Sequence, residues 1–138
     1  MTQNYAKENM AELLYKKESY IIQGAAFDIY KQFRSNYKEK IYHNAYYLGL
    51  TYKGLKVEKE KRIDIYYNGK KVGTYAPDLI VNDIILIELK AKPRLTKDDI
   101  KQFWYYLKGS KYKVGYLINF GVPGGVQIIR RVYDTARK

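Results

Sequence analysis

The stretch that decides the fold is Pro77-Asp78-Leu79-Ile80-Val81-Asn82-Asp83-Ile84-Ile85-Leu86-Ile87-Glu88-Leu89-Lys90. Its aliphatic run at 84–87 is typical of a strand buried on both faces. Side chains alternate along a strand, so Glu88 and Lys90 are expected on one side and Leu89 on the other. Burying a carboxylate at the end of such a strand is unfavourable unless a cation or a donor compensates for it. We therefore expect a charged or metal partner beside Glu88.

Asp78, Glu88 and Lys90 are the residue types that metal-dependent phosphodiester cleavage requires. Two carboxylates bind a hard divalent cation through oxygen. An ammonium group stabilises the negative charge of the transition state or lowers the pKa of an attacking water. The residues alone leave other interpretations open. Asp78 could be an ordinary turn residue, Lys90 a strand-end lysine that reaches solvent, and Glu88–Lys90 a structural ion pair, which gains little over apolar packing.

Length and composition favour one basic domain. The chain has 138 residues, no cysteine and a formal charge of +12 from 26 Lys+Arg against 14 Asp+Glu. We expect a single domain over residues 1–138, with 1–9 as a flexible N-terminus. The absence of cysteine excludes disulfides, thiolate zinc sites and cysteine catalysis. The positive charge suits nucleic acid, although a lysine- and tyrosine-rich compositional bias is an alternative explanation.

Neither a membrane segment nor a signal peptide is predicted. No apolar run approaches the ~20 residues of a membrane span, and the start of the chain lacks the apolar core of a signal peptide. We expect a cytoplasmic protein with no membrane partner.

Hydrophobic periodicity predicts two helices in the first part of the chain. The first covers Met10–Phe33 and is broken at 34–36. The second begins near Tyr37 and stops around Gly54. Its expected buried stripe is Ile41, Ala45, Leu48 and Tyr52.

The remainder of the chain reads as strands around a third helix. Strands are expected at 62–67, 71–81, 84–90 and 114–120, and 126–132 is a last strand or an extended edge. Asn68-Gly69 signals a two-residue hairpin. Thr96 can cap a helix that begins with Asp98 and Asp99 and ends at Gly109. The order ααβββαββ predicts an α/β fold with a central mixed sheet flanked by helices.

This order and these motifs resemble the PD-(D/E)xK nuclease superfamily. Pro77-Asp78 and Glu88-Leu89-Lys90 match its defining motif, and Gln102-x-x-x-Tyr106 is similar to an element of its RecB-like branch. The resemblance covers roughly residues 20–121 and implies a restriction-endonuclease-like core.

A closer resemblance is to the small family named for its GxxExxY motif. The motif appears here as Glu39-Lys40-Ile41-Tyr42, and Leu117–Gly121 is also similar to that family. Asn36 stands where the motif carries glycine, so the chain departs from the family pattern in the loop before the helix. Asn tolerates left-handed backbone geometry better than most residues, so the turn can survive.

The resemblance implies a nuclease that uses Mg2+, with Mn2+ as a substitute, and acts on nucleic acid; DNA is favoured as the substrate, and RNA stays open. It implies that Asp78, Glu88, Glu39 and the carbonyl of Leu89 bind the metal. Lys90 would help a water to attack phosphorus, and Gln102 would orient the metal or the nucleophile. Expected substrate contacts are Tyr106, Tyr42 and Lys92.

Other functions stay open at this point. The chain could be a non-catalytic nucleic-acid-binding module that keeps the fold, or an accessory or toxin-like protein that acts through a protein partner. Endonuclease and exonuclease action both fit, and so does a homodimer. The single histidine, His43, reads as a plain surface residue, and Gly121–Gly125 as a turn because it lacks the lysine and following helix of a phosphate-binding loop.

Overall fold

The aliphatic run that opens the motif forms the central strand of a mixed sheet. The computed structural model describes residues 14–133. Its elements are α2 (Lys16–Phe33), α3 (Glu39–Tyr52), β1 (Val57–Lys59), β2 (Ile63–Tyr67), β3 (Lys70–Tyr75), β4 (Leu79–Val81), β5 (Ile85–Lys90), α4 (Lys97–Gly109), β6 (Val114–Asn119) and β7 (Gln127–Val132). The expected α/β class is confirmed.

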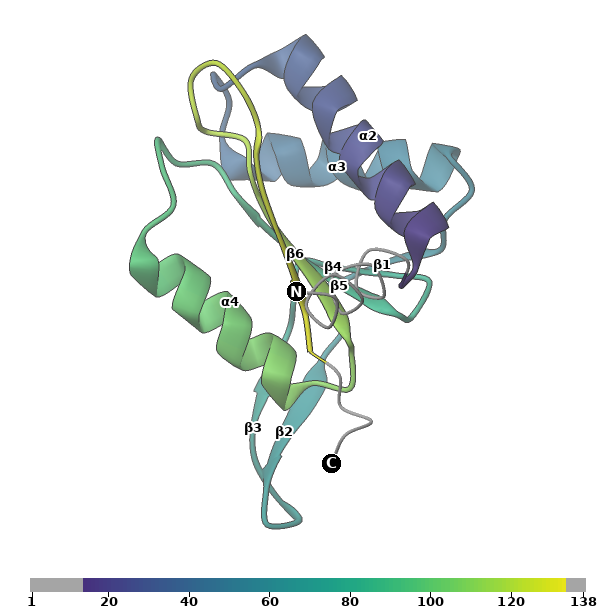
Figure 1. Ribbon diagram of the computed structural model, residues 1–138, viewed down its shortest axis with the longest axis vertical. Coiled ribbons are helices and arrows are strands. Elements are labelled where there is room, and N and C mark those ends of the chain that lie inside the picture. Colours follow the sequence, from purple (N-terminus) through teal and green to yellow (C-terminus); the bar gives the residue numbers. More distant parts are fainter. Residues whose placement is uncertain (1–13, 134–138) are drawn as a thin grey trace, which may run out of the picture.

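Five strands form the main sheet, in the order β1-β4-β5-β6-β7. β5 pairs antiparallel with β4 and parallel with β6, and α4 connects the two parallel strands. Helices α2 and α3 cover one face of this sheet, and α4 covers the other (Figure 1).

Burial along β5 alternates between these two faces. Ile85, Ile87 and Leu89 belong to the core beneath α2 and α3, whereas Leu86 belongs to the core beneath α4. The predicted burial of this strand on both faces is therefore confirmed. Since side chains alternate, Glu88 and Lys90 lie on the α4 side of the sheet, opposite Leu89.

The strand predicted at 71–81 is in fact two strands, β3 and β4, separated by residues 76–78. Pro77 has no N–H for a ladder, which explains why pairing stops there. The predicted hairpin turn is confirmed, with positive φ at Asn68 and Gly69. The hairpin of β2 and β3 forms its own two-stranded sheet and projects from the body (Figure 1). Strand β1 was not predicted.

The stripe predicted for the second helix was wrong. Three of its four members, Ile41, Leu48 and Tyr52, are exposed, and Ala45 is only partly buried. The fully buried residues of α3 are Tyr42, Tyr46 and Leu50. Burial of the tyrosines is possible because both hydroxyls find backbone acceptors: Tyr46 donates to the Ile22 carbonyl at 2.6 Å, and Tyr42 donates to the Arg34 carbonyl.

Local start and stop signals were more reliable. The predicted break after Phe33 is confirmed by the positive φ of Arg34. Thr96 caps α4: its side chain accepts a hydrogen bond from the Asp99 N–H, and the Asp99 side chain accepts one from the Thr96 N–H. The predicted helical residues 10–13 and the flexible segment 1–9 lie outside the described residues. Within 14–133, no helix is both long and apolar enough to cross a membrane.

Candidate active site

Asp78 and Glu88 lie side by side at the ends of neighbouring strands. The backbone N–H of Asp78 donates to Oε1 of Glu88 at 2.8 Å, and the backbone N–H of Leu89 donates to Oδ2 of Asp78 at 2.7 Å. The ladder of β4 and β5 pairs Leu79 with Ile87, which brings the two carboxylates together just beyond it. Each carboxylate thus uses one oxygen for a backbone donor and keeps its second oxygen for another ligand.

The environment of this pair disfavours negative charge. Burial, together with the charge of Asp78, raises the pKa of Glu88 to about 7, against the lowering effects of Tyr75, the Asp78 N–H and Lys90. Burial also raises the pKa of Asp78, although the Leu89 N–H, His43 and Lys90 oppose this. Two partly desolvated carboxylates that repel one another are stabilised by a cation between them.

Lys90 supplies positive charge but does not close an ion pair with Glu88. Its ammonium lowers the pKa of Glu88, Asp78 and Glu39, so its field acts on all three carboxylates. In the described part of the chain, none of the ion pairs includes Lys90. The interpretation of Glu88 and Lys90 as a structural ion pair therefore finds no support.

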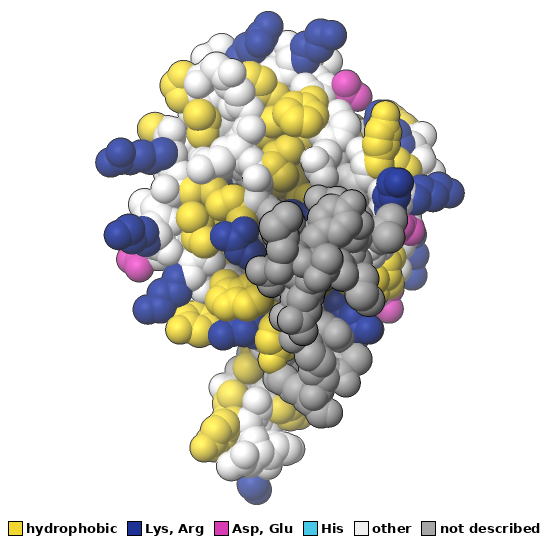
Figure 2. Space-filling model, viewed as in Figure 1, with side chains coloured by type: hydrophobic (Ala, Val, Ile, Leu, Met, Phe, Trp, Pro, Cys, Tyr) yellow, Lys and Arg dark blue, Asp and Glu magenta, His cyan; other side chains and the backbone are white. Residues whose placement is uncertain are grey.

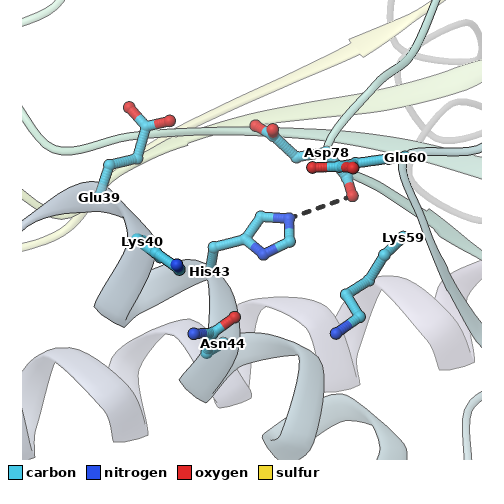
Figure 3. A pocket seen from close by; sticks show the side chains of 7 residues that line it. All are labelled: Glu39, Lys40, His43, Asn44, Lys59, Glu60 and Asp78. Carbon is cyan, nitrogen blue, oxygen red and sulfur yellow. Dashed lines mark hydrogen bonds between the residues drawn. The ribbon is translucent and has the colours of Figure 1, made fainter.

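Glu39 faces Asp78 across a cleft. It is the first residue of α3, and the cleft that it lines with Asp78, His43 and Glu60 has a volume of about 370 Å³. Figure 3 shows Glu39 and Asp78 reaching this cleft from the helix and from the segment before β4. Burial, followed by the charge of Asp78, raises the pKa of Glu39. The structure thus brings Glu39 into the electrostatic neighbourhood of the pair.

Two expected substrate contacts are engaged elsewhere. Tyr42 is fully buried and stacks on Phe120, with ring centroids 4.8 Å apart, so it belongs to the core rather than to a surface that faces substrate. Lys92 forms a 2.8 Å ion pair with Asp99 in the first turn of α4. Its ammonium nevertheless lowers the pKa of Glu39, which places Lys92 at the margin of the site.

Gln102 and Tyr106 lie on one face of α4, and both line a shallow hollow there. Tyr106 stacks on Tyr75, with centroids 3.6 Å apart and planes 4° from parallel. Gln102 is exposed, and no hydrogen bond joins it to Asp78 or Glu88 among the described residues. Tyr106 is therefore linked to the carboxylates through Tyr75, whereas Gln102 is not linked to them in this conformation.

Three residues of the site were missed or set aside at the sequence level. The Tyr75 hydroxyl is buried next to the Glu88 carboxyl, but the two groups do not form a hydrogen bond in the described structure. His43 Nε2 lies 3.3 Å from the Asp78 carbonyl, and Glu60 donates its N–H to the same carbonyl at 3.2 Å. Only the spacing of Tyr75, three residues before Asp78, offered a signal.

The donor set fits a hard divalent cation. The free oxygens of Asp78 and Glu88 are of the type that Mg2+ and Mn2+ prefer. The Leu89 carbonyl points to the same side of its strand as the Leu89 N–H, which faces Asp78. Within residues 14–133, no three His, Cys, Asp or Glu side chains are arranged to hold a metal. Mg2+ needs only one or two carboxylates because it retains several waters.

A family model described as the PD-(D/E)XK nuclease superfamily matches residues 16–132. The chain belongs to the PD-(D/E)XK nuclease superfamily. No curated protein and no solved structure matched in the corresponding comparisons. The match confirms the resemblance and the restriction-endonuclease-like fold, and the closer likeness to the GxxExxY family stays a prediction.

Membership in the superfamily bears on the function of the neighbouring carboxylates of Asp78 and Glu88. The matched region includes Asp78, Glu88 and Lys90, which the sequence predicts to form the superfamily motif, and the structure places the carboxylates of Asp78 and Glu88 beside one another. PD-(D/E)XK proteins are typically nucleases and generally use divalent metals. The superfamily therefore suggests a nuclease with a nucleic-acid substrate.

Proposed function

We propose that this PD-(D/E)XK protein is a Mg2+-dependent nuclease that hydrolyses phosphodiester bonds in DNA. The observation that carries the proposal is the reciprocal bonding of Asp78 and Glu88, which holds two desolvated carboxylates together without an ion pair between Glu88 and Lys90. A structure that used these groups only for stability would leave their mutual repulsion uncompensated.

Asp78, Glu88 and the Leu89 carbonyl would hold the cation, with Glu39 facing them across the cleft. When bound, the cation lowers the pKa of a water and neutralises charge on the phosphate. The backbone bonds from Asp78 and Leu89 fix one oxygen of each carboxylate, so little reorientation is required when the cation binds.

Lys90 faces the same side of the sheet as Glu88 and would act on the reacting phosphate. Its ammonium forms none of the ion pairs found among the described residues, so it can stabilise the negative charge that develops as water attacks phosphorus. Hydrolysis forms a bond from the water oxygen to phosphorus and breaks the bond to the 3′ oxygen. The proton that the attacking water loses passes to solvent, and the 3′ oxygen takes up a proton from solvent, so the products are a 5′ phosphate and a 3′ hydroxyl.

The charge of the protein supports a polyanionic substrate. A net charge of +12 supplies salt-dependent affinity for phosphates. Lys92 borders the site, and Tyr106 supports it through Tyr75. Gln102 would join the site only after a side-chain rearrangement on substrate binding.

Cleavage of a labelled panel tests the proposal. Single-stranded, duplex, flap and four-way-junction DNA, together with RNA, are incubated with Mg2+, with Mn2+ or with EDTA. We expect metal-dependent cleavage of DNA by the wild type, loss of at least about a hundredfold in Glu88→Gln, and none in Asp28→Asn. Asp28 is a suitable control because it is an exposed carboxylate on α2 that forms an ion pair with Lys53, at the surface.

Binding without cutting, with equal affinity in the wild type and in Glu88→Gln, would replace the nuclease by a non-catalytic nucleic-acid-binding module. Cleavage of RNA alone would retain the chemistry and reject DNA as substrate.

A further inference from the structure

The β2–β3 hairpin is built as a separate projection. It pairs with no strand of the five-stranded sheet and extends beyond the body of the molecule next to the end of α4 (Figure 1). Its contacts with the body are at its base, where Tyr75 stacks on Tyr106 and Ile65 packs beside Gly109. The outer half of the hairpin therefore has no role in covering the core.

That outer half carries aromatic and basic side chains in cross-strand pairs. Tyr66 and Tyr67 are 60% and 70% exposed, and they lie opposite Lys71 and Lys70, respectively. Successive strand residues point to opposite faces, so each face of the hairpin has one tyrosine with one lysine across from it. Figure 2 shows hydrophobic side chains and a basic side chain exposed at the projecting end.

Single exposed apolar side chains are common on protein surfaces, whereas several that lie close together mark a binding surface, and Tyr66, Tyr67 and Val72 are all exposed on this hairpin. Among the described residues, the aromatic contacts include neither Tyr66 nor Tyr67. Residues 61–75 contain four basic residues and one acidic residue, Asp64, which forms an exposed 3.3 Å ion pair with Lys71, so the segment keeps a charge of +3. Rings beside ammonium groups are the composition of surfaces that stack on unpaired bases and contact phosphates. Phosphate contact alone would require only the lysines.

The hairpin also leads directly into the site. β3 ends at Tyr75, and Asp78 follows three residues later. From Lys70 to Asp78 the chain spans at most about 26 Å, at ~3.3 Å per residue. A strand held on the hairpin can thus continue to the carboxylate pair.

We propose that the β2–β3 hairpin binds an unpaired DNA strand, with Tyr66 and Tyr67 stacking on bases and Lys70 and Lys71 contacting phosphates. The proposal rests on the proposed nuclease function, since the strand bound here is the substrate of the Asp78–Glu88 site. It predicts that the protein prefers single-stranded DNA, or duplexes with a single-stranded tail, over blunt duplex.

Fluorescence anisotropy tests this directly. The probes are a labelled single strand of about 20 nucleotides, longer than the ~4–16 that one binding fold covers, and the blunt duplex of the same sequence. EDTA prevents cleavage during the measurement. The variants are Tyr66→Thr/Tyr67→Thr, which retains strand propensity, and Lys70→Gln/Lys71→Gln. The matched control is Tyr20→Ala/Tyr52→Ala, whose tyrosines are 73% and 81% exposed on α2 and α3. Circular dichroism establishes that each variant is folded.

We expect the Tyr66/Tyr67 variant to bind the single strand at least about thirtyfold more weakly, because it removes two stacking rings worth roughly 1–3 kcal/mol each, and to bind the duplex as the wild type does. The Lys70/Lys71 variant should lower the salt dependence on the single strand by about 1.4 in the slope of log K against log salt, at ~0.7 per phosphate contact. The control should bind like the wild type.

Equal single-strand affinity in the wild type and in both hairpin variants overturns the proposal, as does an equal loss in the control. A loss confined to the duplex also overturns it. Cleavage in Mg2+, measured on the same DNA, separates the two proposals. Metal-dependent cleavage with hairpin-independent binding rejects the hairpin and retains the nuclease. Hairpin-dependent binding without cleavage rejects the nuclease and leaves a single-strand-binding surface.

Discussion

The backbone N–H of Asp78 donates to the carboxylate of Glu88 at 2.8 Å, from a segment that Pro77 prevents from continuing as a strand. The interruption of the sheet and the geometry of the site thus have a common origin. Had residues 76–78 continued the ladder, the Asp78 N–H would have been directed toward a neighbouring strand. Instead it holds Glu88 in place, and the Asp78 carboxylate accepts a bond from Leu89 in return.

The raised pKa of Glu88 predicts that the metal-free protein becomes less stable as the pH rises. Because burial and Asp78 raise the pKa to about 7, from an ordinary value of 4.5, ionisation is more costly in the folded than in the unfolded state. The contribution of neutral Glu88 to the free energy of unfolding is fully present below about pH 4.5. It is lost as the pH rises to about 7, by about 3 kcal/mol in all. Urea unfolding in EDTA across this range measures it.

Glu88→Gln should flatten this dependence, because the amide cannot ionise. Asp78 and Glu39 also have raised pKa values, so a smaller decline of the same sign should persist in the variant. A wild-type protein whose unfolding free energy is constant or increases over this range would contradict the desolvated pair.

Divalent cations should stabilise the folded protein by mass action. At a Mn2+ or Mg2+ concentration of about 100 times Kd, the gain is about 2.7 kcal/mol, which thermal unfolding detects as an increase in Tm. Asp78→Asn and Glu88→Gln should lose most of this gain, because each removes a charged oxygen ligand. Asp28→Asn should retain it, since its carboxylate is exposed on α2. An identical rise in all four proteins would indicate nonspecific cation binding.

The elements set by local chemistry could be predicted from the sequence. The capped start of α4, the Asn68-Gly69 turn and the apolar run of β5 depend on residues within a few positions of each other. The face of α3 could not be predicted in the same way. Tyrosine suits either a surface or a core, and Tyr46 is buried because its hydroxyl reaches Ile22, which is 24 residues away.

The site shows the same difference between features that depend on nearby residues and features that depend on contacts between distant parts of the chain. Asp78, Glu88 and Lys90 stand out by residue type and spacing, and the structure assembles the two carboxylates as neighbours. Tyr75 and His43 enter the site through contacts between different elements, which spacing does not reveal. The separation of Gln102 from the carboxylates depends on side-chain placement on α4, which the sequence does not specify.

Tyr75→Phe should show whether the Tyr75 hydroxyl contributes to metal binding or whether Tyr75 only packs against Tyr106. The substitution keeps the stack on Tyr106 and removes a buried hydroxyl that has no bonded partner in the described structure. Removal of such a group is neutral or stabilising, by up to about 1 kcal/mol. If the hydroxyl orients Glu88 when the cation is bound, the variant should need a higher Mg2+ concentration for half-maximal cleavage. Unchanged metal dependence would assign Tyr75 to packing alone.

Gly121→Ala should disrupt the loop that follows β5. A Cβ at Gly121 would lie 2.2 Å from the backbone nitrogen of Lys92, too close for any rotamer to relieve. The loop would have to move away from Asn119, whose side chain accepts from the Lys92 N–H at 3.0 Å and donates to its carbonyl at 2.9 Å.

We expect this substitution to lower the free energy of unfolding by about 3 kcal/mol, from overpacking and from loss of the two hydrogen bonds between the buried Asn119 amide and Lys92. Gly125→Ala is the matched control, because a Cβ there meets nothing within 4 Å. It should change the unfolding free energy by less than about 0.5 kcal/mol. Urea unfolding of both variants decides the matter. Equal effects would mean that the close approach of Gly121 to Lys92 does not hold this loop in solution. A selective loss in Gly121→Ala, accompanied by weaker cleavage, would show that the loop after Lys90 must be held in place for the site to work.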